Sequence, residues 1–142
     1  MVFALACVAC AGNLYASNSL QQETTHTRPV TDYANLIGRL RAAGATVKAG
    51  GQVEQSFFSV VGKTIKVYAD DVQVFQYAHT AAMEAQAAQI SADGSTVGTA
   101  KPFWVDAPHF YKSGKLLVLY VGGNAKVLQA LESVLGKQFT GK

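Results

Sequence analysis

Hydrophobic residues along the chain recur with helical spacing in some segments and with strand-like alternation in others. Between residues 31 and 44 the spacing is that of an amphipathic helix, and its apolar members are Tyr33, Leu36, Ile37 and Leu40. Thr31 or Asp32 can act as the N-cap, and Gly44 is a typical helix stop. The pattern therefore predicts a helix at the start of the folded part of the chain.

The segment that follows predicts strands and then a second helix. We expect a turn at residues 49–51, strands over 53–61 and 63–68, and a hairpin over 65–77 that turns at Asp70 and Asp71. Within this hairpin, Ile65 and Val67 share a face with Val72 and Val74. The alanine-rich run over 81–90, which follows His79, predicts a helix whose small side chains allow close packing on a sheet.

The last third of the chain repeats this order of elements. A short strand is expected over 103–105, and a hairpin joins residues 109–111 to residues 116–121 around Gly114. The second strand of that hairpin is apolar on both faces, which predicts a central position in the sheet. A last helix is expected from the cap Asn124 to Gly136, with an apolar stripe formed by Val127, Leu128, Leu131, Val134 and Leu135.

Together these elements predict an α+β fold. We expect a mostly antiparallel sheet built from two ββα units, with an additional helix in front of them. The chain has 142 residues, which is the size of one compact domain that needs no metal or disulfide to fold. We place that domain at residues 31–142.

The first thirty residues have a different composition. Residues 1–11 form an uncharged, mostly apolar run that is too short to span a membrane and resembles the core of a signal peptide. Residues 12–30 are largely polar and without apolar periodicity, which predicts a flexible tether. Both cysteines lie in the apolar run, so a disulfide within the folded domain is excluded.

Cys10 lies in a sequence that resembles the lipobox of bacterial lipoproteins. Val8 and Ala9 fit the pattern, whereas Cys7 stands where leucine is usual and the preceding segment lacks lysine and arginine. The resemblance implies lipidation at Cys10 and a lipid anchor at the outer face of the cytoplasmic membrane. Two alternatives remain open, namely secretion after cleavage near Ala11 or Ala16 and a buried N-terminal helix in a cytosolic protein.

The net charge and the short sequence motifs limit which partners and ligands are expected for this protein. The formal net charge is +3 and the basic residues are scattered, so nucleic acid is not expected as a partner. The densest group of polar and aromatic side chains, proposed as a ligand-binding cluster, is Trp104, Asp106, His109 and Tyr111. No metal or cofactor is expected. The glycines before Asn124 are interpreted as a turn and a helix cap, since they lack the lysine of a phosphate-binding loop.

Paired aromatic residues provide the strongest hint of binding. Phe57-Phe58, Phe103-Trp104 and Phe110-Tyr111 are adjacent pairs, and neighbours on a strand point to opposite faces of a sheet. If helices cover only one face, the other presents an aromatic binding stripe; if they cover both, the rings are core.

Several short motifs between residues 32 and 136 resemble those of small bacterial lipoproteins of unassigned activity. They are Phe57-Phe58-Ser59-Val60, Val72-Gln73-Val74-Phe75, Asp93-Gly94-Ser95 and Pro108-His109-Phe110-Tyr111. The resemblance implies a single exported domain and transfers no catalytic residue. Our first hypothesis is therefore a non-enzymatic, membrane-tethered domain that binds an unknown protein or small ligand. The alternative is an exported hydrolase or metal-dependent enzyme that uses Asp106 and His109.

Overall fold

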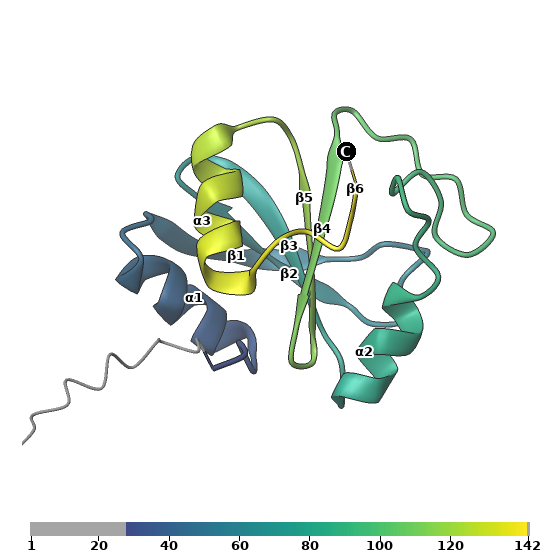
Figure 1. Cartoon of the computed structure of the whole chain (residues 1–142), viewed down its shortest axis with the longest axis horizontal. Helices are drawn as coiled ribbons and strands as arrows, with labels where there is room; N and C mark the ends of the chain where they lie inside the picture. Colours follow the sequence, from purple (N-terminus) through teal and green to yellow (C-terminus); the bar gives the residue numbers. More distant parts are fainter. Residues whose placement is uncertain (1–27, 142) are drawn as a thin grey trace, which may run out of the picture.

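The computed structural model describes residues 28–141, and within them three helices and six strands form an α+β fold (Figure 1). In chain order the elements are α1 (Tyr33–Ala42), β1 (Val47–Val53), β2 (Gly62–Val67), β3 (Asp70–Gln76), α2 (Thr80–Ala87), β4 (Pro108–Ser113), β5 (Leu116–Val121), α3 (Ala125–Leu135) and β6 (Thr140–Gly141). The expected fold class is confirmed. The segments β2–β3–α2 and β4–β5–α3 have the element order of ββα units.

All six strands belong to one antiparallel sheet with the order β1-β2-β3-β5-β4-β6. The hairpins β2–β3 and β4–β5 meet at the centre, where Val74 pairs with Val118. The five residues from Leu116 to Tyr120 are buried, which confirms the central position expected for β5. Gly114 adopts a left-handed φ of 56° in the turn between β4 and β5, as the sequence predicts.

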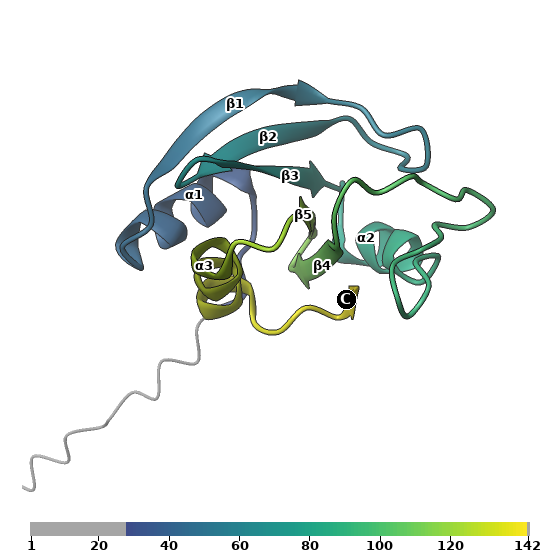
Figure 2. The same cartoon turned by 90° about the horizontal axis from the view of Figure 1, so that it is seen from above.

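Helices lie on both faces of the sheet (Figure 2). On one face, α1 and α3 cover a core that includes Val67, Val74 and Val118. On the other face, α2 and long loops cover a second core that includes Phe75, Phe110 and Leu119. Phe110 and Tyr111 thus point into opposite cores and both are buried. The aromatic pair on β4 is core rather than a binding stripe.

Each of the three helices begins at a capping side chain, and two of these, Asp32 and Asn124, are among the caps that the sequence predicts. The carboxylate of Asp32 accepts a hydrogen bond from the backbone N–H of Asn35, and this bond lowers the pKa of Asp32. His79 caps α2 through Nδ1, which accepts from the N–H of Ala82. Asn124 caps α3 by accepting from the N–H of Lys126. Each of these three side chains thus satisfies a backbone N–H at the start of a helix.

Four local predictions are wrong. Residues 49–51 lie inside β1, where the register shifts between Ala49 and Gln52. Residues 54–61 are turns rather than a strand, and residues 103–105 belong to the loop between α2 and β4. The β2–β3 turn is made by Tyr68 and Ala69, while Asp70 and Asp71 are the first residues of β3.

The N-terminal end of the described chain is tied to the sheet. Val30, which the sequence places in the tether, is fully buried, and its N–H donates to the hydroxyl of Ser113 at 2.8 Å. Cys10 and the remainder of the proposed signal and tether lie outside the described residues. Among the helices of the described part, none combines the length and the apolar character needed to cross a membrane.

Candidate binding surface

The four residues of the predicted binding cluster point in different directions. Trp104 contacts the aromatic core under α2, whereas Tyr111 lies in the core under α1 and α3. His109 is buried on the same side as Tyr111, and its ring stacks on Tyr120 with 6.0 Å between ring centroids. Asp106 is exposed. The structure therefore brings His109 close to Tyr120 and leaves Trp104 on the opposite face of the sheet.

Asp106 and His109 each have their own hydrogen-bond partner. The carboxylate of Asp106 accepts from the N–H of Ala107 at 2.7 Å, and Nδ1 of His109 contacts Oε1 of Gln138. Within residues 28–141 no hydrogen bond joins the two side chains, and no group of three or more histidine, cysteine, aspartate or glutamate side chains is placed to hold a metal. The enzyme hypothesis thus gains no supporting contact from this pair.

Burial changes the acid–base chemistry of Tyr111. Its side chain is 1% exposed, and burial raises the pKa of the phenol to about 12, with a further contribution from the charge of Glu132. A phenol with this pKa stays protonated at neutral pH. Tyr111 thus packs in the core under α1 and α3.

A hydrogen-bonded group of polar residues surrounds Tyr120 at the end of β5. The phenol of Tyr120 donates to Asp70 at 2.7 Å and accepts from the N–H of Asn124 at 3.1 Å. Burial and the bond to Asp70 raise the pKa of Tyr120. At Gly122 a Cβ would lie 2.6 Å from the same phenol oxygen, so the close approach requires glycine. This supports the expected structural role of the glycines before Asn124.

On the solvent side of Tyr120, carboxylates line a hollow in the surface. Asp70, Asp71 and Asp106 line a cavity of about 450 Å³ next to the N-terminus of α3. Asp70 bonds to Tyr120, Asp71 pairs with Lys66 at 2.8 Å, and Asp106 bonds to the backbone. These contacts account for all three carboxylates as parts of the fold.

Two apolar side chains of the α2–β4 loop extend into solvent. Phe103 is 93% exposed and Val105 is 88% exposed, and we call these two residues the apolar tip. Trp104, between them, points inward: its indole N–H donates to the carbonyl of Gly94 at 2.8 Å. Its ring also meets the edges of Phe57 and Phe110, with centroids 5.8 and 6.0 Å apart. The half-buried tryptophan thus helps to hold the segment that carries the apolar tip.

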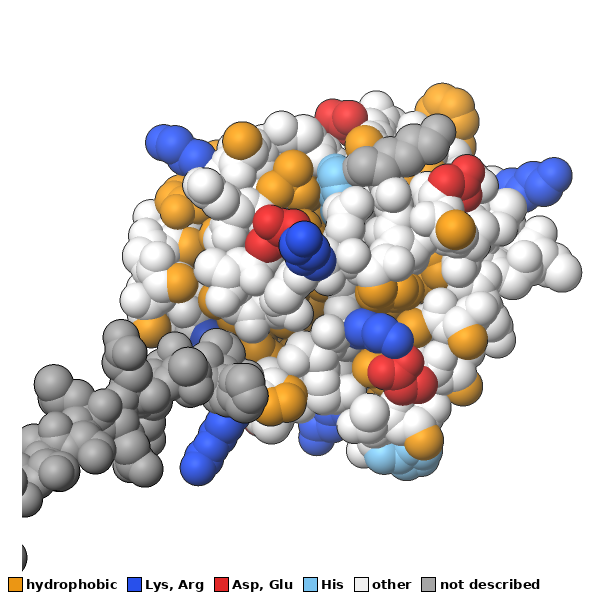
Figure 3. Space-filling view, in the orientation of Figure 1, with side chains coloured by type: hydrophobic (Ala, Val, Ile, Leu, Met, Phe, Trp, Pro, Cys, Tyr) orange, Lys and Arg blue, Asp and Glu red, His pale blue; other side chains and the backbone are white. Residues whose placement is uncertain are grey.

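The remaining surface offers no comparable feature on the side that Figure 3 displays. Basic and acidic side chains are interspersed there, with hydrophobic groups scattered between them. This distribution agrees with the mild net charge and the scattered lysines and arginines of the sequence.

The sequence prediction and the structure single out different side chains within residues 103–111. The sequence prediction chose Trp104 as part of the densest group of polar and aromatic side chains, whereas the most exposed apolar side chains of the segment are Phe103 and Val105. It also missed the bond between Asp70 and Tyr120. A tyrosine within a strand that is apolar on both faces was the available signal, because a buried phenol usually finds a hydrogen-bond partner.

Comparisons with known proteins identify no relative. No family model matches the chain, and no curated protein and no solved structure matches it.

Proposed function

We propose that this protein is a non-enzymatic binding domain, held at the bacterial cell envelope by a lipid on Cys10, that contacts a partner protein through the apolar tip. The observation that carries the proposal is the nearly complete exposure of Phe103 and Val105 on a segment fixed by Trp104. Burying a phenylalanine or valine side chain against a partner gains roughly 1.5–3 kcal/mol. A fixed loop also loses less conformational entropy on binding than a mobile one.

The position of the loop supports a protein partner. In Figures 1 and 2 the α2–β4 loop projects at the end of the molecule opposite α1, beside which the described chain begins. A domain attached through its N-terminal segment would carry the apolar tip on the side away from that attachment. A diacylglyceryl group, with or without a further acyl chain, supplies the two lipid chains that stable anchoring needs.

The anchor is tested by intact-mass analysis of the membrane fraction after expression with the native N-terminus, beside Cys10→Ala. We expect a chain that begins at Cys10 and carries a lipid, and no such species in the variant. An unmodified chain that begins at Met1 would disprove the anchored form.

The binding surface is tested separately by photo-crosslinking in cells from a reactive residue placed at position 101. We expect a discrete adduct with one envelope protein, and its loss when Phe103→Ser and Val105→Ser are combined. Val61→Ser is the matched control, because Val61 is also exposed, at 51%, but lies between β1 and β2. An adduct that persists in the double variant would contradict a role for the apolar tip.

A further inference from the structure

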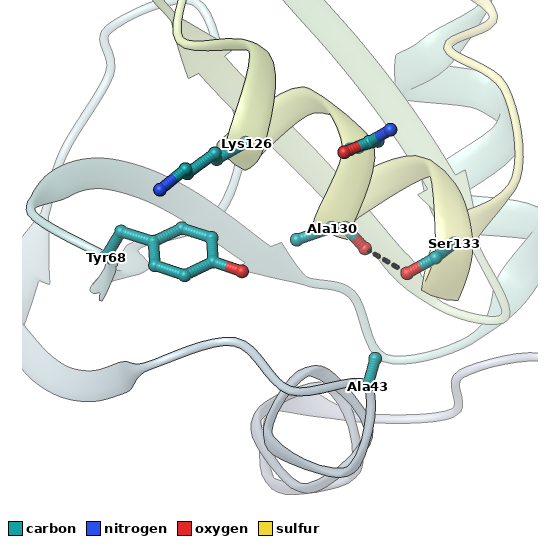
Figure 4. A pocket seen from close by; sticks show the side chains of 6 residues that line it. Ala43, Tyr68, Lys126, Ala130 and Ser133 are labelled. Carbon is teal, nitrogen blue, oxygen red and sulfur yellow. Dashed lines mark hydrogen bonds between the residues drawn. The ribbon is translucent and has the colours of Figure 1, made fainter.

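A second possible binding site lies on the other side of the molecule, between α3, the end of α1 and the β2–β3 turn. Here a cavity of about 420 Å³ is lined by Ala43, Tyr68, Lys126, Gln129, Ala130 and Ser133 (Figure 4). The four residues from α3 follow helical spacing, so they form one continuous face of that helix. The ring of Tyr68 extends under this face and closes one side of the cavity.

Tyr68 adopts an unfavourable backbone conformation to occupy this place. Its φ is 58°, and within residues 28–141 it is the single residue other than glycine with a positive φ. A left-handed conformation costs free energy in any residue that has a Cβ, and glycine or asparagine normally fills such a turn position. The N–H of Tyr68 donates to the carbonyl of Thr46 at 2.7 Å, a bond that any residue other than proline could make.

The side chain of Tyr68 is only partly buried beneath α3. It is 39% exposed, and in the described part of the chain its phenol makes no hydrogen bond. Strained residues of this kind concentrate at functional sites, because the strain persists where the side chain is needed. The strained turn and the cavity thus point to the same residue.

The lining defines the chemistry of a ligand. Lys126 is its one charged side chain, no carboxylate lines the cavity, and Lys126 takes part in neither of the ion pairs of residues 28–141. The amide of Gln129 and the phenol of Tyr68 add hydrogen-bond donors. The hydroxyl of Ser133 donates to the carbonyl of Ala130 at 2.7 Å, which leaves its oxygen as an acceptor. The Tyr68 ring and two alanines supply apolar walls.

We propose that this cavity binds a small aromatic carboxylate, with its anionic group at Lys126 and its ring against the ring of Tyr68. A single ammonium matches the charge of one carboxylate, and an aromatic ring gains from stacking on another beyond its buried area. The site does not involve the apolar tip, so it stands independently of the proposed function.

The test is a titration of the full chain with benzoate, followed by amide NMR shifts, with benzamide as the neutral analogue. We expect saturable shifts at Lys126 and Gln129 with a Kd of about 1 mM, and at least tenfold weaker binding of benzamide. Lys126→Gln should weaken benzoate binding by a similar factor, whereas Lys48→Gln, at an exposed position of β1, should leave it unchanged. Absent shifts, or equal binding of the two compounds, would overturn the proposal.

Tyr68→Gly separates a role in binding from a role in folding. Glycine relieves the strained φ and removes the ring, so we expect loss of benzoate binding together with an unchanged or raised Tm. A lowered Tm would show that Tyr68 serves the fold and would overturn its assignment to a ligand site.

Discussion

The two faces of the sheet are closed in different ways. The α1/α3 face has a mainly aliphatic core, which also holds Tyr111 and Tyr120. Two amphipathic helices cover it and bury Leu36, Leu40 and Leu131. The opposite face has an aromatic core beneath the eight-residue helix α2 and long loops, where Phe57, Phe58 and Trp104 pack edge to face. Helices satisfy their own backbone hydrogen bonds, but loops must find partners individually. The loop-covered face therefore carries buried polar groups and also bears the exposed tip.

We expect the largest effect at the centre of the aromatic face. Phe110 is fully buried and its ring meets Trp104 and Phe139, with centroids 6.0 and 6.4 Å apart. Phe110→Ala should lower the free energy of unfolding by about 3–5 kcal/mol in urea titrations, through lost burial and the cavity left behind. Phe103→Ala is the control, because its exposed ring should contribute less than about 0.5 kcal/mol. Equal losses would contradict the assignment of the two rings.

Truncating a side chain in the core of the α1/α3 face should lower the free energy of unfolding nearly as much, but it should affect tryptophan fluorescence differently. Leu131→Ala removes a fully buried side chain of α3 and should cost about 2–5 kcal/mol. The native fluorescence of Trp104 should stay unchanged, because the indole lies in the other core. Phe110→Ala should shift that fluorescence. A shift in both variants would show that the two cores are coupled through the sheet.

Gln86 tests the polar content of the loop-covered face. Its buried side chain accepts from the N–H of Ser59 at 3.0 Å and donates to the carbonyl of Phe57 at 3.4 Å, so it binds the 54–61 segment to α2. Gln86→Ala leaves these backbone groups without their partner and should cost about 1–3 kcal/mol in thermal unfolding. Gln129→Ala, at an exposed site of α3, should change stability little. Equal losses of stability in Gln86→Ala and Gln129→Ala would show that the buried hydrogen bonds of Gln86 do not stabilise the fold.

The smallest effect at neutral pH is expected at Tyr77. Its buried phenol lies near the side chain of Ser59 but makes no well-formed hydrogen bond within the described residues, so Tyr77→Phe should leave the free energy of unfolding unchanged or raise it by up to about 1 kcal/mol. A clear loss of stability at pH 7 would show that the hydroxyl has a partner after all.

Alkaline titration compares one tyrosine from each face. Burial raises the pKa of Tyr77, like that of Tyr111, from 10.0 to about 12. Between these values the unfolded chain releases phenolic protons that the folded chain retains, so stability is intact below pH 10 and falls as the pH approaches about 12. Tyr77→Phe and Tyr111→Phe should each flatten this fall in urea titrations at several pH values. An unchanged slope in either variant would place its phenol in contact with solvent.

Sequence reasoning succeeded where one side chain determines one local structure. The caps Asp32 and Asn124, the left-handed Gly114 and the doubly apolar β5 are all of this kind. It failed at β1, where Ala49-Gly50-Gly51 has the composition of a turn. In the structure, Gly50 lies so close to β2 that a Cβ would be 2.7 Å from the carbonyl oxygen of Thr64. Gly50 marks an irregularity in β1. This irregularity can be recognised only when the position of the neighbouring strand is known.

The two candidate binding sites also depend on contacts between distant segments, which local sequence patterns do not reveal. Residues 103–105 lie in a loop that the indole of Trp104 joins to Gly94, and no local pattern encodes this contact between segments. Tyr68 gives no turn signal, because tyrosine is a typical strand residue. Its role in the cavity follows only from its φ and from the approach of α3.

The irregular register of β1 also bears on how copies of this protein behave at high concentration. β1 forms one outer edge of the sheet, and its register shifts between Ala49 and Gln52. The opposite edge is β6, a strand of two residues. A bent edge and a very short one are poor templates for a strand from another molecule. Along β1 and β6 the sheet therefore offers little regular edge for the addition of a strand from another molecule.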